Sequence, residues 1–333
     1  LLRDMVRLSQ YFLPFEELEI ERLFRRIRLV EYNETIELGN DVAITFLDAG
    51  HIPGSAAIRV NTPSHEVLYT GDINTINTQL LQAAKLAKAA PDALVLESTY
   101  ALTAHRDRTE IEEEFVETAA TTIDNGGTVL VPAFAVARAQ EILCILARYK
   151  AQYPIYMDGM AREASRIFLQ HPDFFRDYKL LKRALRNTNW IRNRRQRESV
   201  AKKPGLVVAP AGMLRGGSAA MYMSHIMHDP KNAILLVGYQ IPGTPGRELL
   251  DHGTFDDGNG VKRVKAQYQL FDFSSHAGQN QLLSLASSFP KVKEIFTVHG
   301  EADACTFLAK TLRKQNSINA RAVEIGEHIT LKE

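Results

Sequence analysis

The stretch EVLYTGDINTINTQLLQAAKLAKAAPDALVLESTY (66–100) holds two short apolar runs, and each run ends at an acidic side chain. The first run reaches Asp72 through a glycine, and the second reaches Glu97 directly. Runs of about four to eight residues rich in Val, Leu and Tyr, bounded by polar turns, are typical of strands. The stretch therefore predicts two strands that each end at a carboxylate.

Similar runs recur along the chain and alternate with helical segments. Apolar residues follow a helical period in ARAQEILCILARYK (137–150) and ADACTFLAKTLRKQ (302–315). This alternation predicts an α/β fold in which helices cover the sheets. The cluster IPGTPG (241–246) is the predicted crossing between domains, because Gly and Pro interrupt regular structure. Further strands are predicted at 42–50, 127–134, 154–159, 205–212, 233–239, 267–273 and 294–300.

Composition limits the class of protein. The 333 residues are 45% hydrophobic and 24% charged, which is ordinary for one large or two medium globular domains. No apolar run approaches the roughly 18 residues of a membrane-spanning helix, and no secretory leader is evident. Cys144 and Cys305 stand far apart, so neither a disulfide framework nor a cysteine zinc site is expected. These features predict a cytoplasmic protein without membrane association.

One segment is strongly basic. Residues 182–203 contain nine Lys or Arg residues, one acid and Trp190. Such a run is most often a solvated helix face, but it is also typical of a surface that contacts nucleic-acid phosphates. In the second interpretation Arg192, Arg194 and Arg195 contact RNA, and Trp190 is available to stack on a base.

Five strand ends, or the turns after them, carry imidazole or carboxylate groups: His51, Asp72, Glu97, His276 and His299. Taken singly, such a histidine is more often solvated or capping than a ligand, and an Asp after Gly usually forms a turn. Together they are the donors that Zn²⁺ accepts when thiolates are absent. A carboxylate can be shared by two cations, which can stabilise the attacking and leaving oxygens of phosphodiester hydrolysis. The set indicates a two-metal hydrolytic site.

Over nearly its whole length, the chain resembles the β-CASP metallo-β-lactamase ribonucleases. This family includes the nuclease subunit that cleaves pre-mRNA 3′ ends. The motifs that carry the resemblance are, in order, AGHIPGSA (49–56), YTGD (69–72), LESTY (96–100), VPAFAVARAQE (131–141), APAGML (209–214), FSSHAG (273–278) and TVHGE (297–301).

The resemblance implies a role for each of the five residues. His51 would be a ligand of one zinc and His299 of the second, while Asp72 would bridge both ions. His276 would act as general acid, held by the carboxylate of Glu97. The resemblance thus implies a ribonuclease, endonucleolytic, 5′-to-3′ exonucleolytic or both, that uses two Zn²⁺ ions to hydrolyse RNA.

Further residues fall in family-like motifs. Ser274 and Ser275 belong to FSSHAG and are expected to contact phosphate, although loop serines usually cap turns. Arg138 and Arg247 are candidates for the same role, and a surface ion pair is the ordinary alternative for each. His105 is expected to support the site from outside the metal shell.

The resemblance also implies the architecture. The predicted fold is an αββα metallo-β-lactamase sandwich, incomplete at its N-terminus, with an inserted α/β β-CASP domain. The expected boundaries are 1–106 for the first part of the metallo-β-lactamase domain, 107–245 for the β-CASP domain and 246–333 for the C-terminal part of the first domain. RNA would lie in a groove between the domains.

The sequence departs from the family in one respect that matters for the metal. The family signature H-x-H-x-D-H supplies further zinc ligands, but no histidine occurs in residues 1–50. We expect that the sequence is truncated at its amino end. Three protein ligands for two ions are too few for tight binding, so this chain is expected to bind zinc poorly and to cleave RNA weakly or not at all. In a smaller departure, Ala137 stands where the family usually has Gly.

Two other functions remain open. An inactive, metal-free RNA-binding scaffold subunit of a processing complex would explain the missing signature, but it would not need all five of the residues above. A DNA-directed nuclease of the same superfamily is the other alternative, because likeness of fold does not fix the substrate. A homodimer, or association with processing-complex subunits, is expected by analogy.

Overall fold

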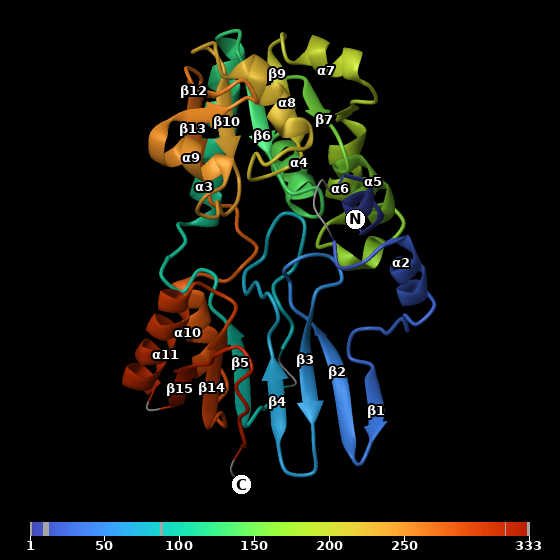
Figure 1. Cartoon of the computed structure of the whole chain (residues 1–333), viewed down its shortest axis with the longest axis vertical. Helices are drawn as coiled ribbons and strands as arrows, with labels where there is room; N and C mark the ends of the chain where they lie inside the picture. Colours follow the sequence, from blue (N-terminus) through green and yellow to red (C-terminus); the bar gives the residue numbers. More distant parts are fainter. Residues whose placement is uncertain (1, 9–12, 87–88, 317, 332–333) are drawn as a thin grey trace.

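The computed structural model describes residues 2–8, 13–86, 89–316 and 318–331, which form two units stacked along the long axis of the molecule (Figure 1). The main sheet of the first unit has seven strands, and that of the second has six. No helix in these ranges is long and apolar enough to cross a membrane. The α/β architecture predicted from the alternating pattern is confirmed.

The first unit contains a mixed sheet in the order β1-β2-β3-β4-β5-β14-β15. Strands β1 to β4 pair antiparallel, whereas β4, β5, β14 and β15 run parallel. Helices α10 and α11 pack against it (Figure 1), where Leu282 and Leu308 bury against Leu94, Leu96 and Ile295. The bounds are α1 (Leu2–Leu8), α2 (Glu17–Phe24), β1 (Thr35–Gly39), β2 (Val42–Asp48), β3 (Ala56–Asn61), β4 (Glu66–Tyr69), β5 (Ala93–Glu97), α10 (Gln279–Ser287), β14 (Glu294–Val298), α11 (Ala302–Asn316) and β15 (Asn319–Ala322).

The second unit contains a fully parallel sheet in the order β13-β10-β6-β9-β7-β8. Every residue of β6 and β9 is buried, as expected when helices cover both faces of a parallel sheet. Val129 and Val131 pack with Phe115 on one face, while Leu130 packs with Tyr222 on the other. The bounds are α3 (Arg108–Asp124), β6 (Thr128–Pro132), α4 (Arg138–Arg148), β7 (Ile155–Met157), α5 (Ala161–Phe168), a 3-10 turn (Pro172–Phe174), α6 (Tyr178–Arg186), β8 (Asn189–Trp190), α7 (Arg194–Val200), β9 (Gly205–Ala209), α8 (Gly217–Ile226), β10 (Ala233–Leu236), α9 (Pro245–His252), β11 (Thr254–Asp256), β12 (Val261–Arg263) and β13 (Gln267–Leu270).

The chain leaves the second unit at a different place from the one predicted. The cluster IPGTPG (241–246) leads into α9, whose Leu249 is buried in the core of the second unit, so it is not a crossing between units. Strand β13 then pairs with β10 from Ala233↔Gln267 to Leu236↔Leu270. By sheet membership the second unit extends to Leu270, beyond the boundary expected at 245.

A buried carboxylate joins the two units. Glu141 on α4 accepts hydrogen bonds from the backbone N–H groups of Gln79 at 3.0 Å and Leu80 at 2.7 Å, in the long loop that follows β4. Arg108 Nη2 donates to the same carboxylate at 2.5 Å. Because a buried carboxylate needs such donors to offset its lost hydration, this contact fixes the loop of the first unit against α4 of the second.

Candidate active site

The parallel strands β4, β5 and β14 end at one edge of the first sheet, where Glu97 ends β5 and the loops after β4 and β14 carry Asp72 and His299. Register pairs Glu97 on β5 with Val298 on β14, so His299 lies directly beside Ser98, whose N–H donates to the His299 carbonyl at 3.1 Å. His299 has φ +50°, in the left-handed region. At Gly300, a Cβ would lie 2.7 Å from the Ser98 carbonyl oxygen, so only glycine fits after His299.

Asp72 lies between two histidines. Its Oδ2 is 3.6 Å from His51 Nε2, and its Oδ1 is 3.3 Å from His299 Nδ1. His51 Nδ1 donates to the Ser275 carbonyl at 2.9 Å, which leaves the lone pair of Nε2 directed toward Asp72. Burial lowers the pKa of His51, and the neighbouring His276 lowers it further, so the imidazole is held in the neutral form that binds metals.

This donor set fits a divalent cation, because imidazole and carboxylate are the groups that Zn²⁺ accepts when thiolates are absent. Each Asp72 oxygen faces a different imidazole. Ligand atoms of His51, Asp72 and His276 lie within 4.8 Å of one another, and the same holds for Glu97, His276 and His299. Without His276, whose Nδ1 is engaged by Glu97, the described residues of these groups offer the imidazoles of His51 and His299 and the carboxylate of Asp72. A tight zinc site ordinarily has three or four donors for each ion.

Beside this donor set, Glu97 and His276 form a hydrogen-bonded carboxylate–imidazole pair. The carboxylate of Glu97 is 1% exposed and lies 2.9 and 3.0 Å from His276 Nδ1, and it also accepts from the Ile73 N–H at 2.6 Å. Burial alone would raise the pKa of Glu97, but the hydrogen bond and charge of His276 outweigh it and hold the pKa below its usual value. Glu97 therefore stays ionised, fixes the ring by its Nδ1–H and leaves Nε2 free.

A second pair holds the loop that carries His276. His105 Nδ1 is 2.6 Å from Asp272 Oδ2, and its Nε2 is 3.1 Å from the His276 carbonyl. Asp272 Oδ1 accepts from the Ser274 N–H at 3.1 Å. Burial disfavours the charged form of both groups, but the hydrogen bond and the opposite charge of the partner outweigh burial. The pKa of His105 is therefore raised, and that of Asp272 is lowered. The structure thus places His105 behind the site, in contact with its loop.

Comparison with known families identifies the domains of the chain. Residues 5–99 match a metallo-β-lactamase superfamily domain, 139–249 match the Beta-Casp domain, and 261–323 match a Zn-dependent metallo-hydrolase RNA specificity domain. The chain is 34% identical over 342 residues to "Probable RNase MJ4" of Methanocaldococcus jannaschii, covering 99% of this chain and 79% of that protein. The chain belongs to the β-CASP metallo-β-lactamase family.

Other relatives agree with this assignment. "RNase aCSPSF2" of Saccharolobus solfataricus is 37% identical, over 99% of this chain and 67% of that protein. "Transcription termination factor FttA" of Pyrococcus horikoshii is 32% identical, but the chain spans only 52% of its length. A crystal structure of a protein of unknown function from Enterococcus faecalis V583 has a TM-score of 0.55 at 15% identity, covering 96% of this chain and 70% of that one, and it shows the fold alone.

The second unit, which contains the match to the Beta-Casp domain and is called the β-CASP unit below, contributes a buried arginine to the site. Arg138, the first residue of α4, is 9% exposed, and its Nη2 donates to Ser275 Oγ at 3.0 Å, whereas its Nε and Nη1 have no protein partner. Burial and the nearby Arg108 lower the pKa of Arg138 to about 10, so it remains charged at pH 7. Ala137 before it has φ +67° and forms a γ-turn, closed by Arg138 N–H donating to Val136 at 2.9 Å. The family glycine at this position would relieve that strain.

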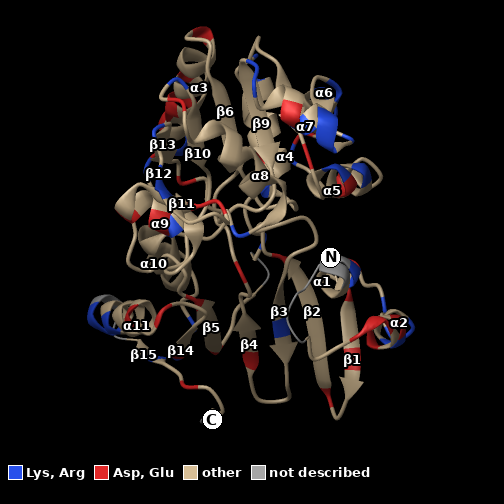
Figure 2. Ribbon diagram, turned by 45° about the horizontal axis from the view of Figure 1, so that its top comes forward, with Lys and Arg blue, Asp and Glu red and all other residues tan. Residues whose placement is uncertain are grey.

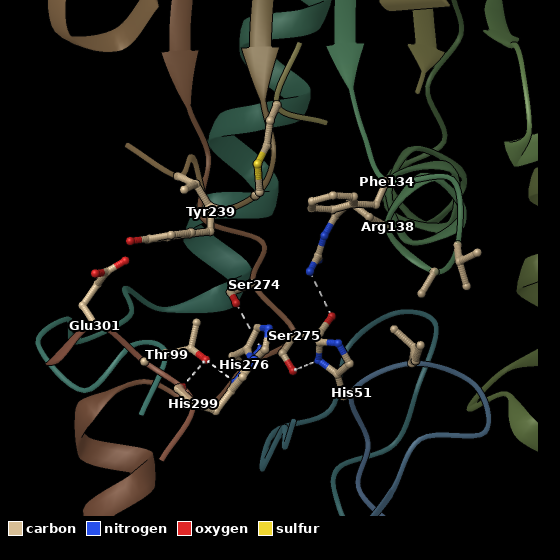
Figure 3. A pocket seen from close by; sticks show the side chains of 17 residues that line it. His51, Thr99, Phe134, Arg138, Tyr239, Ser274, Ser275, His276, His299 and Glu301 are labelled. Atoms are coloured by element: carbon tan, nitrogen blue, oxygen red, sulfur yellow. Dashed lines mark hydrogen bonds between the residues drawn. The ribbon is translucent and has the colours of Figure 1, made fainter. Parts of the chain in front are cut away.

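A cavity of about 470 Å³ lies between the two units and joins these groups. Figure 3 shows His51, His276 and His299 along one side, with Arg138 and Phe134 on a second and Tyr239 and Glu301 on a third. Ser274 and Ser275 also line the cavity. Four further residues were missed in the sequence. Thr99, whose Oγ1 lies 3.1 Å from His299 Nδ1, lines the cavity together with Phe134 and Tyr239, whereas Asp272 lies behind it against His105. Of these, Thr99 and Phe134 lie within quoted motifs, and Asp272 directly precedes another.

Other predicted substrate contacts lie away from this cavity. Arg247 on α9 is bound to Asp251 at 2.7 Å and lines a different cavity beside Tyr239. Arg192, Arg194 and Arg195 do not line the catalytic cavity, and they lie at or near α7, at the outer end of the β-CASP unit (Figure 1). Figure 2 shows basic residues of α6 on the outside of the same unit. The structure does not bring these arginines to the active site.

Trp190 is not available to stack on a base in this structure. Its indole N–H donates to the Leu185 carbonyl at 3.1 Å, and the ring packs against the core of the β-CASP unit. The guanidinium of Arg166 lies over the ring, 5.6 Å from its centre. Apolar packing and a cation–π contact within the protein therefore already occupy this side chain.

Proposed function

We propose that this protein is a zinc-dependent hydrolase that cleaves RNA phosphodiester bonds. The observation that carries the proposal is the position of Asp72, whose two oxygens face His51 and His299 on opposite sides, beside the separate Glu97–His276 pair. One group of residues is thus suited to hold cations, and another is suited to move a proton. RNA as substrate is supported by the match to an RNA specificity domain and by the RNase names of two relatives.

The residues of the site would have different roles in hydrolysis. His51, Asp72 and His299 would hold the metal, which when bound supplies Lewis-acid stabilisation of the phosphodiester and a source of hydroxide at neutral pH. His276 would protonate the leaving oxygen from Nε2, with its imidazolium stabilised by Glu97. Arg138 and Ser275 would hold a phosphate oxygen through the unpaired Nε and Nη1 and through Oγ.

The proposed substrate can be tested with matched RNA and DNA oligonucleotides of one sequence, each labelled in turn at either end. The zinc-loaded, full-length natural protein is expected to cleave the RNA and to cleave the DNA much more slowly. The two labels distinguish endonucleolytic products from stepwise shortening. Preferential cleavage of DNA would identify a DNA-directed nuclease, and binding of RNA without cleavage would identify a scaffold subunit.

Residues 1–333 by themselves are expected to bind zinc weakly. In the part of the chain that the structure describes, each cation would have one imidazole and a shared carboxylate, which are too few donors for a tight site. Elemental analysis after dialysis against buffered zinc is expected to show well below one equivalent for residues 1–333. Two tightly bound equivalents in this chain would contradict the assignment of His51, Asp72 and His299 as its complete set of metal ligands.

A further inference from the structure

Large apolar side chains also line the catalytic cavity, and binding of a phosphate gives no reason for them. Phe134, Met213 and Ile241 line the cavity, and Figure 3 shows Phe134 and Tyr239 on different sides of it. Phe134 is 46% exposed and Ile241 45% exposed, although large apolar side chains near the end of buried strands are ordinarily covered. An exposed aromatic ring in a cavity that also holds a charged Arg138 indicates a site for a ligand with an apolar, flat part beside an anionic one.

The position of Phe134 is fixed by its backbone. It follows β6, and its carbonyl accepts the Ala139 N–H at 3.0 Å at the start of α4. Gly212 lies against it, because a Cβ there would be 3.2 Å from the Phe134 nitrogen and 3.5 Å from the ring, and a Cβ at Gly238 would be 3.9 Å from the ring. Two glycines therefore leave the ring uncovered by side chains while its backbone is held rigid.

The charges around the ring dictate how a nucleotide would enter. Arg138 stands on the same side of the cavity as Phe134 and has two unpaired, buried donor nitrogens, whereas the carboxylate of Glu301 lies on the far side beside Tyr239 (Figure 3). A phosphate is drawn to Arg138 and repelled by Glu301. The base of the nucleotide that carries this phosphate would then lie beside the ring of Phe134.

We propose that Phe134 stacks on the nucleobase of the nucleotide whose phosphate contacts Arg138, with Tyr239 enclosing the base from the other side. This inference rests on the proposed RNA substrate. Every base has a π-face, so stacking on one ring accepts all four bases without hydrogen-bond selection. The site would therefore position RNA for cleavage with little sequence preference at this nucleotide.

The proposal is tested by comparing RNA with a chain that lacks bases. Stopped-flow fluorescence anisotropy on the zinc-loaded, full-length natural protein reads binding before cleavage begins. The two ligands are a fluorescent oligouridylate and an abasic oligoribose phosphate of the same length. Phe134→Ala and Phe134→Leu are expected to weaken oligouridylate binding roughly 5- to 100-fold and to change abasic binding less than about twofold.

Two further variants complete the experiment. Phe134→Tyr keeps the ring and is expected to retain binding of oligouridylate, while Arg138→Gln is expected to weaken both ligands alike. Equal losses for both ligands in Phe134→Ala, or no loss for either, would overturn the stacking role and leave the RNA substrate standing. If the unaltered protein binds neither ligand, the proposed function itself fails, and the inference fails with it.

Discussion

Asp72→Asn is expected to reduce RNA cleavage by the zinc-loaded, full-length natural protein by at least about a thousandfold, because shared-carboxylate binding of two cations contributes several kcal/mol to such reactions. The amide keeps the shape of the side chain but removes its charge and one acceptor oxygen. Since Oδ1 and Oδ2 face different histidines, one substitution should disturb both cation sites. Zinc content measured by elemental analysis should fall together with the rate.

Asp41→Asn is the matched control. Asp41 is exposed in the turn between β1 and β2, with φ +57°, a conformation that asparagine also accepts. This variant makes the same chemical change far from the cavity and should retain both zinc and cleavage. If Asp72→Asn kept two equivalents of zinc and a near-normal rate, Asp72 could not be the shared ligand.

His276→Ala is expected to separate proton transfer from metal binding. Loss of a positioned general acid typically reduces a rate by about 10²- to 10⁴-fold. Zinc content should stay near that of the unaltered protein, because Nδ1 of His276 is engaged by Glu97 and His276 is not needed to hold the cations. This outcome is informative because ligand atoms of His276 also lie within 4.8 Å of both groups of metal donors.

A modified substrate tests directly whether His276 acts as the general acid. An RNA whose leaving oxygen is replaced by sulfur needs no protonation on departure, so His276→Ala should cleave it at close to the rate of the unaltered protein. His228→Ala, at an exposed position, is the control and should behave as the unaltered protein on both substrates. Loss of zinc in His276→Ala would show that His276 is a metal ligand. Failure of the sulfur substrate to restore the rate would contradict its role as general acid.

Much of this site could be predicted from the sequence, because the residues of the site lie at or just after the ends of strands. Strands such as 93–99 and 294–300 were predicted from short apolar runs, and parallel neighbours end at the same edge of a sheet. This rule brings Glu97 and His299 together although they are 202 positions apart in the chain. The family resemblance, and not periodicity, supplied the division of roles among the histidines.

Other features could not be read from the sequence for physical reasons. Strand order depends on tertiary packing, so the pairing of β13 with β10 in the second sheet was not predicted. The burial of Arg138 depends on how the two units meet, and one arginine in a motif does not reveal it. A run of positive charge likewise does not say which face it occupies, and the run at 182–203 lies away from the cavity.

The most direct measurement is a crystal structure of the zinc-loaded, full-length natural protein with anomalous scattering recorded at the zinc edge. The account predicts two anomalous peaks, one beside each carboxylate oxygen of Asp72, with His51 at one and His299 at the other. A single peak held by Glu97 and His276, or peaks that leave Asp72 without contact, would contradict it.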